Sequence, residues 1–359
     1  MSKEEIQKVT HTKHVLLRPD SYVGVTSKST DSFWILEGDK FKLSKLSVSL
    51  ALWKIFDEIL VNAIDRNTQF PREVTAISVL VDKENGIISV ENNGPLGGIS
   101  VEKHSTEGIW NPELTFGHLL TSSNYNDEKK KIVGGRNGYG AKLANIFSTE
   151  FVVDIKDSVN RQRYIQKWQN NMEKCNPPKI TKYSGSKSSV NIIFKPDWPR
   201  FEMSGLDEDF YKIIEKRVYD SLICTSSNCK INFMGTSLKK MTSENYAKMY
   251  LETGTKVATL NSERWSVTIA PSDTGFQQVS FANGICTTQG GTHVDHVSSQ
   301  VVNGIIDDMG KKIKLKPQFV KNTMFIFVNS VIENPTFSSQ VKSQCTLKPS
   351  SFGSAFLPT

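Results

Sequence analysis

The sequence has few cysteines and no long hydrophobic run. Its five cysteines include no Cys-x-x-Cys pair, so neither a zinc site of the usual spacing nor a disulfide framework is expected, and a reducing compartment fits the chain. No apolar stretch is long enough to span a bilayer, and the polar residues 1–10 lack the apolar core of a signal peptide. These absences indicate a cytosolic or nuclear protein without a membrane partner.

Length and charge set the next limits. A chain of 359 residues is too long for one ordinary hydrophobic core, so we expect two domains. Apolar residues make up 38% of the chain and charged residues 23%, which is typical of a globular protein rather than a disordered one. The net charge of +7 permits a polyanionic partner without requiring one.

Apolar periodicity predicts a helix over residues 48–66, with Leu52, Phe56 and Ile59 in its apolar stripe. Glu58, Asn62 and Asp65 fall at i, i+4 and i+7 and share another side of this helix. One interpretation is an ordinary solvent-exposed face. The other is phosphate chemistry: a carboxylate activates water, and a single amide oxygen can hold Mg²⁺, which keeps several of its waters.

A glycine-rich segment at 134–142 is the sharpest local signal, because glycines let backbone N–H groups approach an anion. A helix predicted to start near Gly140 would add its N-terminal dipole, and Lys142 a point charge. The segment is not a P-loop, since no Ser or Thr follows Lys142, and it is not a dinucleotide fingerprint, since a charged stretch precedes it instead of a strand. A flexible glycine hinge is the alternative interpretation.

The remaining elements follow from alternation and turn residues. Residues 93–98 are expected to be a loop, residues 122–136 a long loop or lid, and the domain boundary is placed near Met241. Strands are predicted at 76–81, 87–90, 150–155, 189–194, 265–270, 278–282 and 324–328, and helices at 140–147, 207–224 and 293–309.

Seven segments in one consistent order carry a family resemblance: 16–24, 54–63, 116–125, 134–148, 290–293, 327–329 and 333–337. Through them the chain resembles the N-terminal ATPase and transducer region of eukaryotic-type DNA topoisomerase II, a type IIA topoisomerase. The resemblance implies an α+β fold: a two-layer α/β sandwich shared with gyrase, certain chaperones, histidine kinases and MutL, followed by a smaller α/β transducer domain. It places the ATPase domain and its N-terminal arm at 1–240 and a transducer domain, truncated at its C-terminus, at 241–359.

The resemblance also implies roles for individual residues. Glu58 is similar to the general base, Asn62 to the magnesium ligand, and Asn92 to the residue that reads adenine. Gln340 and Lys342 match a segment that reaches the terminal phosphate, Lys342 being counted as catalytic. The remaining nucleotide contacts implied are Ser122, Ser123 and Asn124 in the lid, and Gly135, Arg136, Asn137, Gly138, Tyr139, Gly140, Ala141 and Lys142 in the phosphate cradle. Val341, Arg66 and the longer loop 93–98 depart from the family pattern.

The function implied is an ATP- and Mg²⁺-dependent gate that forms a homodimer on ATP binding and traps a DNA segment. No DNA-cleavage motif occurs in this sequence. DNA cleavage would therefore need a cleavage core in the same or another polypeptide. Lys311 and Lys312 lie in a basic stretch that either contacts DNA phosphates or is a solvated loop. The family implies the nucleus, or the cytoplasm of a host cell if the protein is viral.

Two other functions fit part of the pattern. One is another ATPase of the same fold class, such as a chaperone or a MutL-like clamp. ATP turnover by a chaperone would not respond to DNA. The other is a DNA-binding remnant that keeps the fold but does not hydrolyse ATP.

Overall fold

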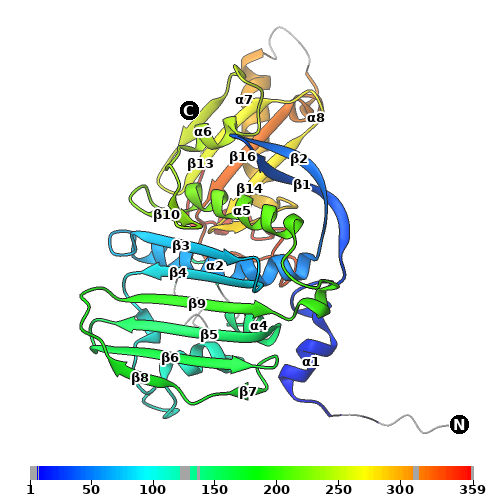
Figure 1. Cartoon of the computed structure of the whole chain (residues 1–359). Helices are drawn as coiled ribbons and strands as arrows, with labels where there is room; N and C mark the ends of the chain where they lie inside the picture. Colours follow the sequence, from blue (N-terminus) through cyan, green and yellow to red (C-terminus); the bar gives the residue numbers. More distant parts are fainter. Residues whose placement is uncertain (1–5, 7, 122–129, 136–137, 310–314, 357–359) are drawn as a thin grey trace, which may run out of the picture.

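The computed structural model describes residues 6, 8–121, 130–135, 138–309 and 315–356. Its strands form a large sheet, a smaller sheet and an N-terminal hairpin. In Figure 1 the two sheets lie one above the other, with helices α2 and α5 near their junction. The mixed composition of helices and largely antiparallel strands confirms the α+β class.

The N-terminal arm precedes the large sheet. It contains α1 (His11–Leu17) and the antiparallel hairpin of β1 (Ser29–Glu37) and β2 (Lys40–Val48). The side chain of Phe41 is buried against Tyr246 and Tyr250, residues that follow the large sheet in the chain. The hairpin therefore packs on the second half of the molecule, an arrangement for which the sequence pattern gave no signal.

Helix α2 (Leu50–Gln69) is the predicted central helix, extended by one turn at its C-terminus. Ser49 caps it, because its Oγ accepts a hydrogen bond from Leu52 N. Most of the helix is buried, so it has a second packed side besides the apolar stripe.

The large sheet has the order β11-β10-β3-β4-β9-β5-β6-β7, with β8 also paired to β6. All neighbours are antiparallel except β10 and β3. Its strands are β3 (Ala76–Asp82), β4 (Ile87–Asn93), β5 (Ser148–Asp157), β6 (Gln162–Gln169), β7 (Lys174–Cys175), β8 (Lys179–Lys182), β9 (Ser189–Pro196), β10 (Lys230–Phe233) and β11 (Thr236–Ser237).

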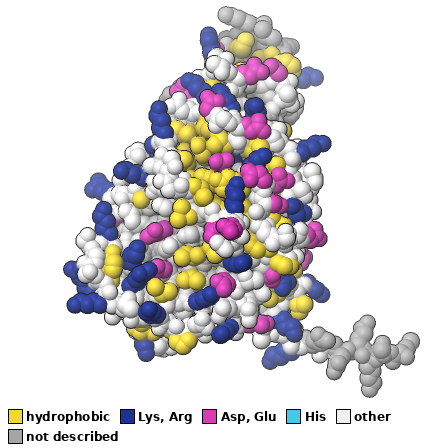
Figure 2. Space-filling view, in the orientation of Figure 1, with side chains coloured by type: hydrophobic (Ala, Val, Ile, Leu, Met, Phe, Trp, Pro, Cys, Tyr) yellow, Lys and Arg dark blue, Asp and Glu magenta, His cyan; other side chains and the backbone are white. Residues whose placement is uncertain are grey.

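Helices α2, α4 (Gly140–Ile146) and α5 (Glu208–Cys224) pack on one face of this sheet and enclose the main core; α3 (Asn111–Gly117) packs beside α4. The other face is solvated, and its strands alternate buried and partly exposed residues. Figure 2 shows basic and acidic side chains interspersed over the face that it draws. Cross-strand ion pairs such as Arg163–Asp154 and Lys167–Glu150 lie on these strands.

The smaller sheet has the order β12-β13-β16-β14-β15, and only β14 and β16 run parallel. Its strands are β12 (Ala258–Asn261), β13 (Trp265–Pro271), β14 (Gln277–Ala282), β15 (Ile285–Cys286) and β16 (Met324–Ser330). Helices α6 (Ser243–Lys248), α7 (Thr292–Met309) and α8 (Pro317–Asn322) accompany it. The strands and the long helix predicted for the second half are therefore present.

The cysteines and the possibility of a membrane-spanning helix can be examined in the described part of the chain. All five cysteines are described, and all are free thiols. Within the described ranges no helix is long and apolar enough to cross a membrane.

Candidate active site

A cavity of about 860 Å³ opens between α2, α4, the strands β4 and β9, and the segment around Lys342. It brings together residues that are distant in the sequence. The predicted site residues that line it are Glu58, Asn62, Asn92, Gly135, Gly138, Tyr139, Gly140, Ala141, Lys142, Gln340 and Lys342. The predicted residues Ser122, Ser123, Asn124, Arg136, Asn137, Lys311 and Lys312 lie outside the described residues.

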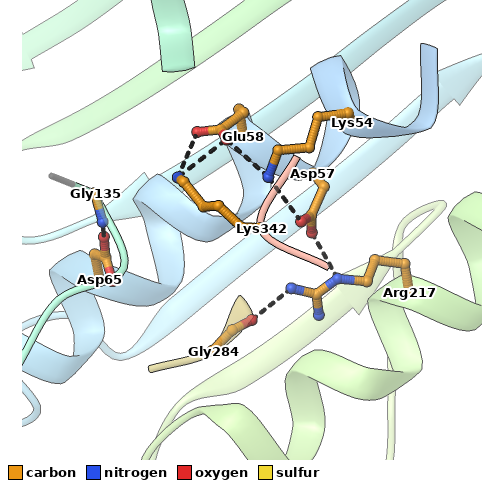
Figure 3. Close-up of polar contacts among 8 residues, drawn as sticks. All are labelled: Lys54, Asp57, Glu58, Asp65, Gly135, Arg217, Gly284 and Lys342. Carbon is orange, nitrogen blue, oxygen red and sulfur yellow. Dashed lines mark hydrogen bonds and ion pairs between the residues drawn. The ribbon is translucent and has the colours of Figure 1, made fainter. Parts of the chain in front are cut away.

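Glu58 lies at the centre of a buried charge cluster (Figure 3). Its carboxylate accepts hydrogen bonds from two ammonium groups: Lys54 Nζ at 2.8 Å and Lys342 Nζ at 3.1 Å. Burial alone would raise the pKa of Glu58, but the charges of Lys342 and Lys54 outweigh it and lower the pKa to about 2. Only 3% of Glu58 and 7% of Asp65 is exposed, so the interpretation of this helix side as a solvent-exposed face is wrong.

Lys342 reaches this cluster from the segment that follows β16. The residue is 5% exposed and has a φ of 63°, in the left-handed region that a residue with a side chain rarely adopts. Its backbone N–H donates to Ser339 O at 3.0 Å and closes a tight turn. The turn directs Nζ into the cavity.

Asp65 connects α2 to the glycine turn, by which we mean the described residues Gly134, Gly135 and 138–140. Its two carboxylate oxygens accept hydrogen bonds from Gly134 N at 2.8 Å and Gly135 N at 2.9 Å. Burial raises the pKa of Asp65 to about 7 despite these two hydrogen bonds. The sequence placed Asp65 on the polar side of the helix, but it did not predict that this carboxylate would hold the glycine turn.

The glycine turn passes very close to α2. A Cβ built on Gly140 would lie 2.2 Å from Glu58 Oε2, a distance that real side chains do not reach. Lys142 is buried and donates from Nζ to Thr121 O at 2.6 Å; burial lowers its pKa to about 8. In this structure Lys142 therefore ties α4 to the backbone at Thr121.

The opposite end of the cavity is mostly apolar. Val90, Leu96, Ile99, Val190 and Ile192 contribute to its lining. The buried amide of Asn92 stands among them and donates from Nδ2 to Asn93 O at 3.1 Å. A polar amide on an apolar wall is suited to orienting a flat heterocycle.

Arg66, one departure from the family pattern, has a structural role here. Its Nη2 donates to Pro95 O at 3.0 Å and its Nη1 to Gln69 Oε1 at 2.9 Å. Its guanidinium also lies 5.0 Å from the ring centroid of Phe70. These contacts hold the longer loop 93–98 against α2.

The sequence pattern did not predict a buried ion pair next to Glu58, between Arg217 and Asp57 (Figure 3). Arg217 of α5 pairs through Nε with Asp57 Oδ1 at 2.6 Å and donates from Nη2 to Gly284 O at 2.6 Å. Gly284 lies in the turn between β14 and β15, so this pair links the smaller sheet to α2. The i, i+4 spacing of Lys54 and Glu58 was a readable signal, whereas no local pattern identifies Arg217.

Comparisons with known proteins show which chains this one resembles in sequence and fold. Residues 232–352 match the DNA gyrase B family model. The ATPase region of Saccharomyces cerevisiae topoisomerase II has a TM-score of 0.93 and 42% identity, with coverage of 99% of this chain and 93% of that one. The ATPase and transducer domains of Balamuthia mandrillaris DNA topoisomerase II have a TM-score of 0.94 and 37% identity, with coverage of 100% and 93%.

Full-length relatives extend well beyond this sequence. DNA topoisomerase 2 of Arabidopsis thaliana is 43% identical over 364 residues, which is 98% of this chain but 24% of the relative. The chain thus spans about a quarter of the curated relatives it matches. From the agreement in sequence, fold and coverage, we conclude that the chain belongs to the DNA topoisomerase II family and corresponds to that family's ATPase region.

Proposed function

We propose that the chain binds and hydrolyses ATP as the N-terminal gate of a type IIA DNA topoisomerase. Binding of ATP would join two copies into a homodimer that traps a DNA segment, and cleavage would require a core in the same or another polypeptide. The observation that carries the proposal is that Glu58, the glycine turn and Lys342 border one cavity. Such convergence of a carboxylate, approachable backbone and a cation suits phosphate chemistry.

The cavity suggests how ATP would be oriented. Its apolar end would hold the adenine, with Asn92 making the polar contact. The phosphates would lie toward the glycine turn, where the absence of side chains on Gly135 and Gly140 leaves backbone accessible. Gln340 and Lys342 would contact the terminal phosphate, and the lid residues Ser122, Ser123 and Asn124 complete the proposed contacts.

In this mechanism Glu58 accepts a proton from the water that attacks the terminal phosphate. With both lysines bound, the pKa of Glu58 is about 2 and the carboxylate is a weak base. When Lys342 donates its hydrogen bonds to the terminal phosphate instead, Glu58 loses one of its two cations and its pKa rises. Lys54, at 2.8 Å, keeps the carboxylate oriented during this change.

We also propose Mg²⁺ as the accompanying metal. The side chain of Asn62 lines the cavity one helical turn from Glu58, and an amide oxygen with several waters fits the ligand preference of Mg²⁺. When bound, Mg²⁺ would neutralise charge on the phosphates. Asn62 would hold it on the side of the cavity that Asp65 and Gly135 also border.

The domain assignment belongs to the same proposal. We place the ATPase domain with its arm at 1–240 and the transducer at 241–359, because the large sheet ends at Ser237 and α6 packs against strands of the smaller sheet. The contacts of Lys342 with Glu58 and of Gly284 with Arg217 would connect the second domain to the first.

Lys311 and Lys312 are proposed contacts to DNA phosphates. The nucleus is the proposed location of the protein.

Steady-state ATP turnover of the chain, with and without duplex DNA, tests the proposal. We expect turnover that rises when DNA is added. Turnover that ignores DNA would favour a chaperone-like ATPase of the same fold class. Nucleotide binding without phosphate release would favour a non-hydrolysing remnant.

A further inference from the structure

The segment Gly290-Gly291-Thr292-His293 is one of the most distinctive in the sequence, yet it does not line the cavity. It joins β15 to α7. We call residues 287–292 the clamp, because they form hydrogen bonds with the residues that immediately follow Lys342.

Several hydrogen bonds join the clamp to residues 343–347. Gln289 N donates to Ser343 O at 2.9 Å, Cys345 N to Gly290 O at 3.0 Å, and Thr292 N to Cys345 O at 3.0 Å. The Oγ1 of Thr292 also donates to Leu347 O at 2.5 Å. The first of these bonds is made by the residue next to Lys342, so the clamp limits where the backbone of Lys342 can lie.

The fit is too close for a side chain in the middle of the clamp. Gly291 has a φ of 128°, and a Cβ built on it would lie 2.1 Å from Cys345 O and 2.6 Å from Cys345 N. Gly291 and Cys345 form an isolated parallel β-bridge. Glycine is therefore required for both its conformation and the space it leaves.

A buried polar chain supports the clamp from the side of the smaller sheet. Ser280 Oγ of β14 lies 2.5 Å from Thr287 Oγ1, which lies 3.1 Å from Nε2 of His293. All three residues are at most 2% exposed. Burial lowers the pKa of His293 to about 4, so the ring is neutral near pH 7. Hydrogen bonds between buried groups hold a single geometry, because breaking one leaves a polar atom without water.

We propose that Ser280, Thr287 and His293 are positioning residues for Lys342, acting through the clamp to hold its ammonium group where a terminal phosphate would lie. The inference rests on the proposed role of Lys342 in contacting that phosphate. It assigns the Gly290–His293 motif a task in nucleotide discrimination, although the motif itself does not line the cavity.

Thr287→Val tests the proposal, because valine keeps the shape of threonine and removes the hydroxyl. Thr287→Ser restores the hydroxyl. Ser298→Ala is the matched control: Ser298 is a fully buried residue of α7 whose Oγ donates to Asp295 O, within the same helix. Hydrogen exchange of the Gln289, Thr292 and Cys345 amides is measured without nucleotide, and affinities are measured for ADP and for the β,γ-imido analogue of ATP.

We expect Thr287→Val to speed exchange of those three amides and to weaken analogue binding by about five- to tenfold relative to ADP, as for the loss of one buried hydrogen bond. Thr287→Ser should restore both readouts, and Ser298→Ala should change neither. A purely structural role would lower stability without changing the ratio of the two affinities.

Two results would overturn the inference. If the three amides exchange at the same rate in Thr287→Val as in Ser298→Ala, the clamp does not depend on the polar chain. If exchange becomes faster in Thr287→Val but the ratio of analogue to ADP affinity stays at the wild-type value, the clamp does not position Lys342. Lys342→Ala, measured in parallel, separates this failure from failure of the proposed function. If Lys342→Ala leaves the ratio of analogue to ADP affinity unchanged, Lys342 does not contact the terminal phosphate. The inference then fails together with the proposed role of Lys342.

Discussion

The Nζ atom of Lys342 lies 3.1 Å from Oε1 of Glu58, although 284 positions separate the two residues in the sequence. Both are buried, and Lys342 adopts a left-handed backbone conformation to make the contact. The contact joins the segment after the smaller sheet to the central helix of the large one. It also places a cation where it controls how basic Glu58 is.

Lys342→Ala should reduce discrimination between nucleotides. A charge-assisted hydrogen bond contributes about 1.5–3 kcal/mol, so the affinity for the β,γ-imido analogue of ATP should fall about ten- to hundredfold while that for ADP changes little. Titration calorimetry with both nucleotides measures the two effects. Lys348→Ala, which removes an exposed lysine nearby in the sequence, is the control. Equal weakening for both nucleotides would contradict the assignment.

Gly140→Ala should impair turnover more than folding. The new Cβ would lie 2.2 Å from Glu58 Oε2 and displace the carboxylate, and a misplacement of about 1 Å can cost on the order of a hundredfold in rate. Gly304→Ala is the matched control in α7, because no atom lies within 4 Å of its built Cβ. Turnover measured for both variants decides the matter, and near-wild-type turnover in Gly140→Ala would show that the close approach is unimportant.

Asp65 should make stability depend on pH. Its pKa is about 7 in the folded chain, above the ordinary value of 3.8, so between these pH values the folded state holds a proton that the unfolded state has released. Its stabilising contribution is complete below pH 3.8 and is lost as pH rises through 7. Asp65→Asn removes the titration, and its stability relative to wild type should therefore increase from pH 5 to pH 8.

Denaturant unfolding of both proteins at the two pH values measures this difference. A stability difference between Asp65→Asn and wild type that is the same at pH 5 and pH 8 would show that Asp65 does not titrate in this range. Substitution of the exposed Asp273 by Asn controls for the general loss of a carboxylate.

Arg217→Met should destabilise the chain strongly. It leaves the carboxylate of Asp57 buried with its 2.6 Å partner removed, and breaking a buried ion pair costs about 3–5 kcal/mol. Arg163→Met removes the partly exposed pair with Asp154 and should cost at most about 1 kcal/mol. The free energies of unfolding of both variants measure the contrast; similar losses would mean that the buried pair contributes little.

The sequence predicted long elements with strong periodicity well. Helix α2 was expected at 48–66 and spans Leu50–Gln69, and α7 was expected at 293–309 and spans Thr292–Met309. It did not predict β1, β2 or β6, whose alternation is interrupted by polar residues and whose burial depends on partners distant in the chain. Tertiary packing, not local propensity, defines these strands.

The candidate site shows the same division. Glu58 and Asn62 follow from helical spacing, and the glycine turn from composition, because each signal is local. The contact of Asp65 with Gly134 and Gly135 and the pairing of Arg217 with Asp57 join segments that the fold alone brings together. Placing Lys342 at Glu58 required the family resemblance, since no pattern in residues 338–345 points to α2.

Phosphate release by Glu58→Gln is the most direct test of the central claim, that Glu58 activates water beside a nucleotide held by the glycine turn and Lys342. Glutamine keeps the shape of the side chain but cannot take up the proton, so phosphate release should fall at least about a hundredfold while nucleotide binding persists. Release at the wild-type rate by a folded Glu58→Gln chain would contradict the account.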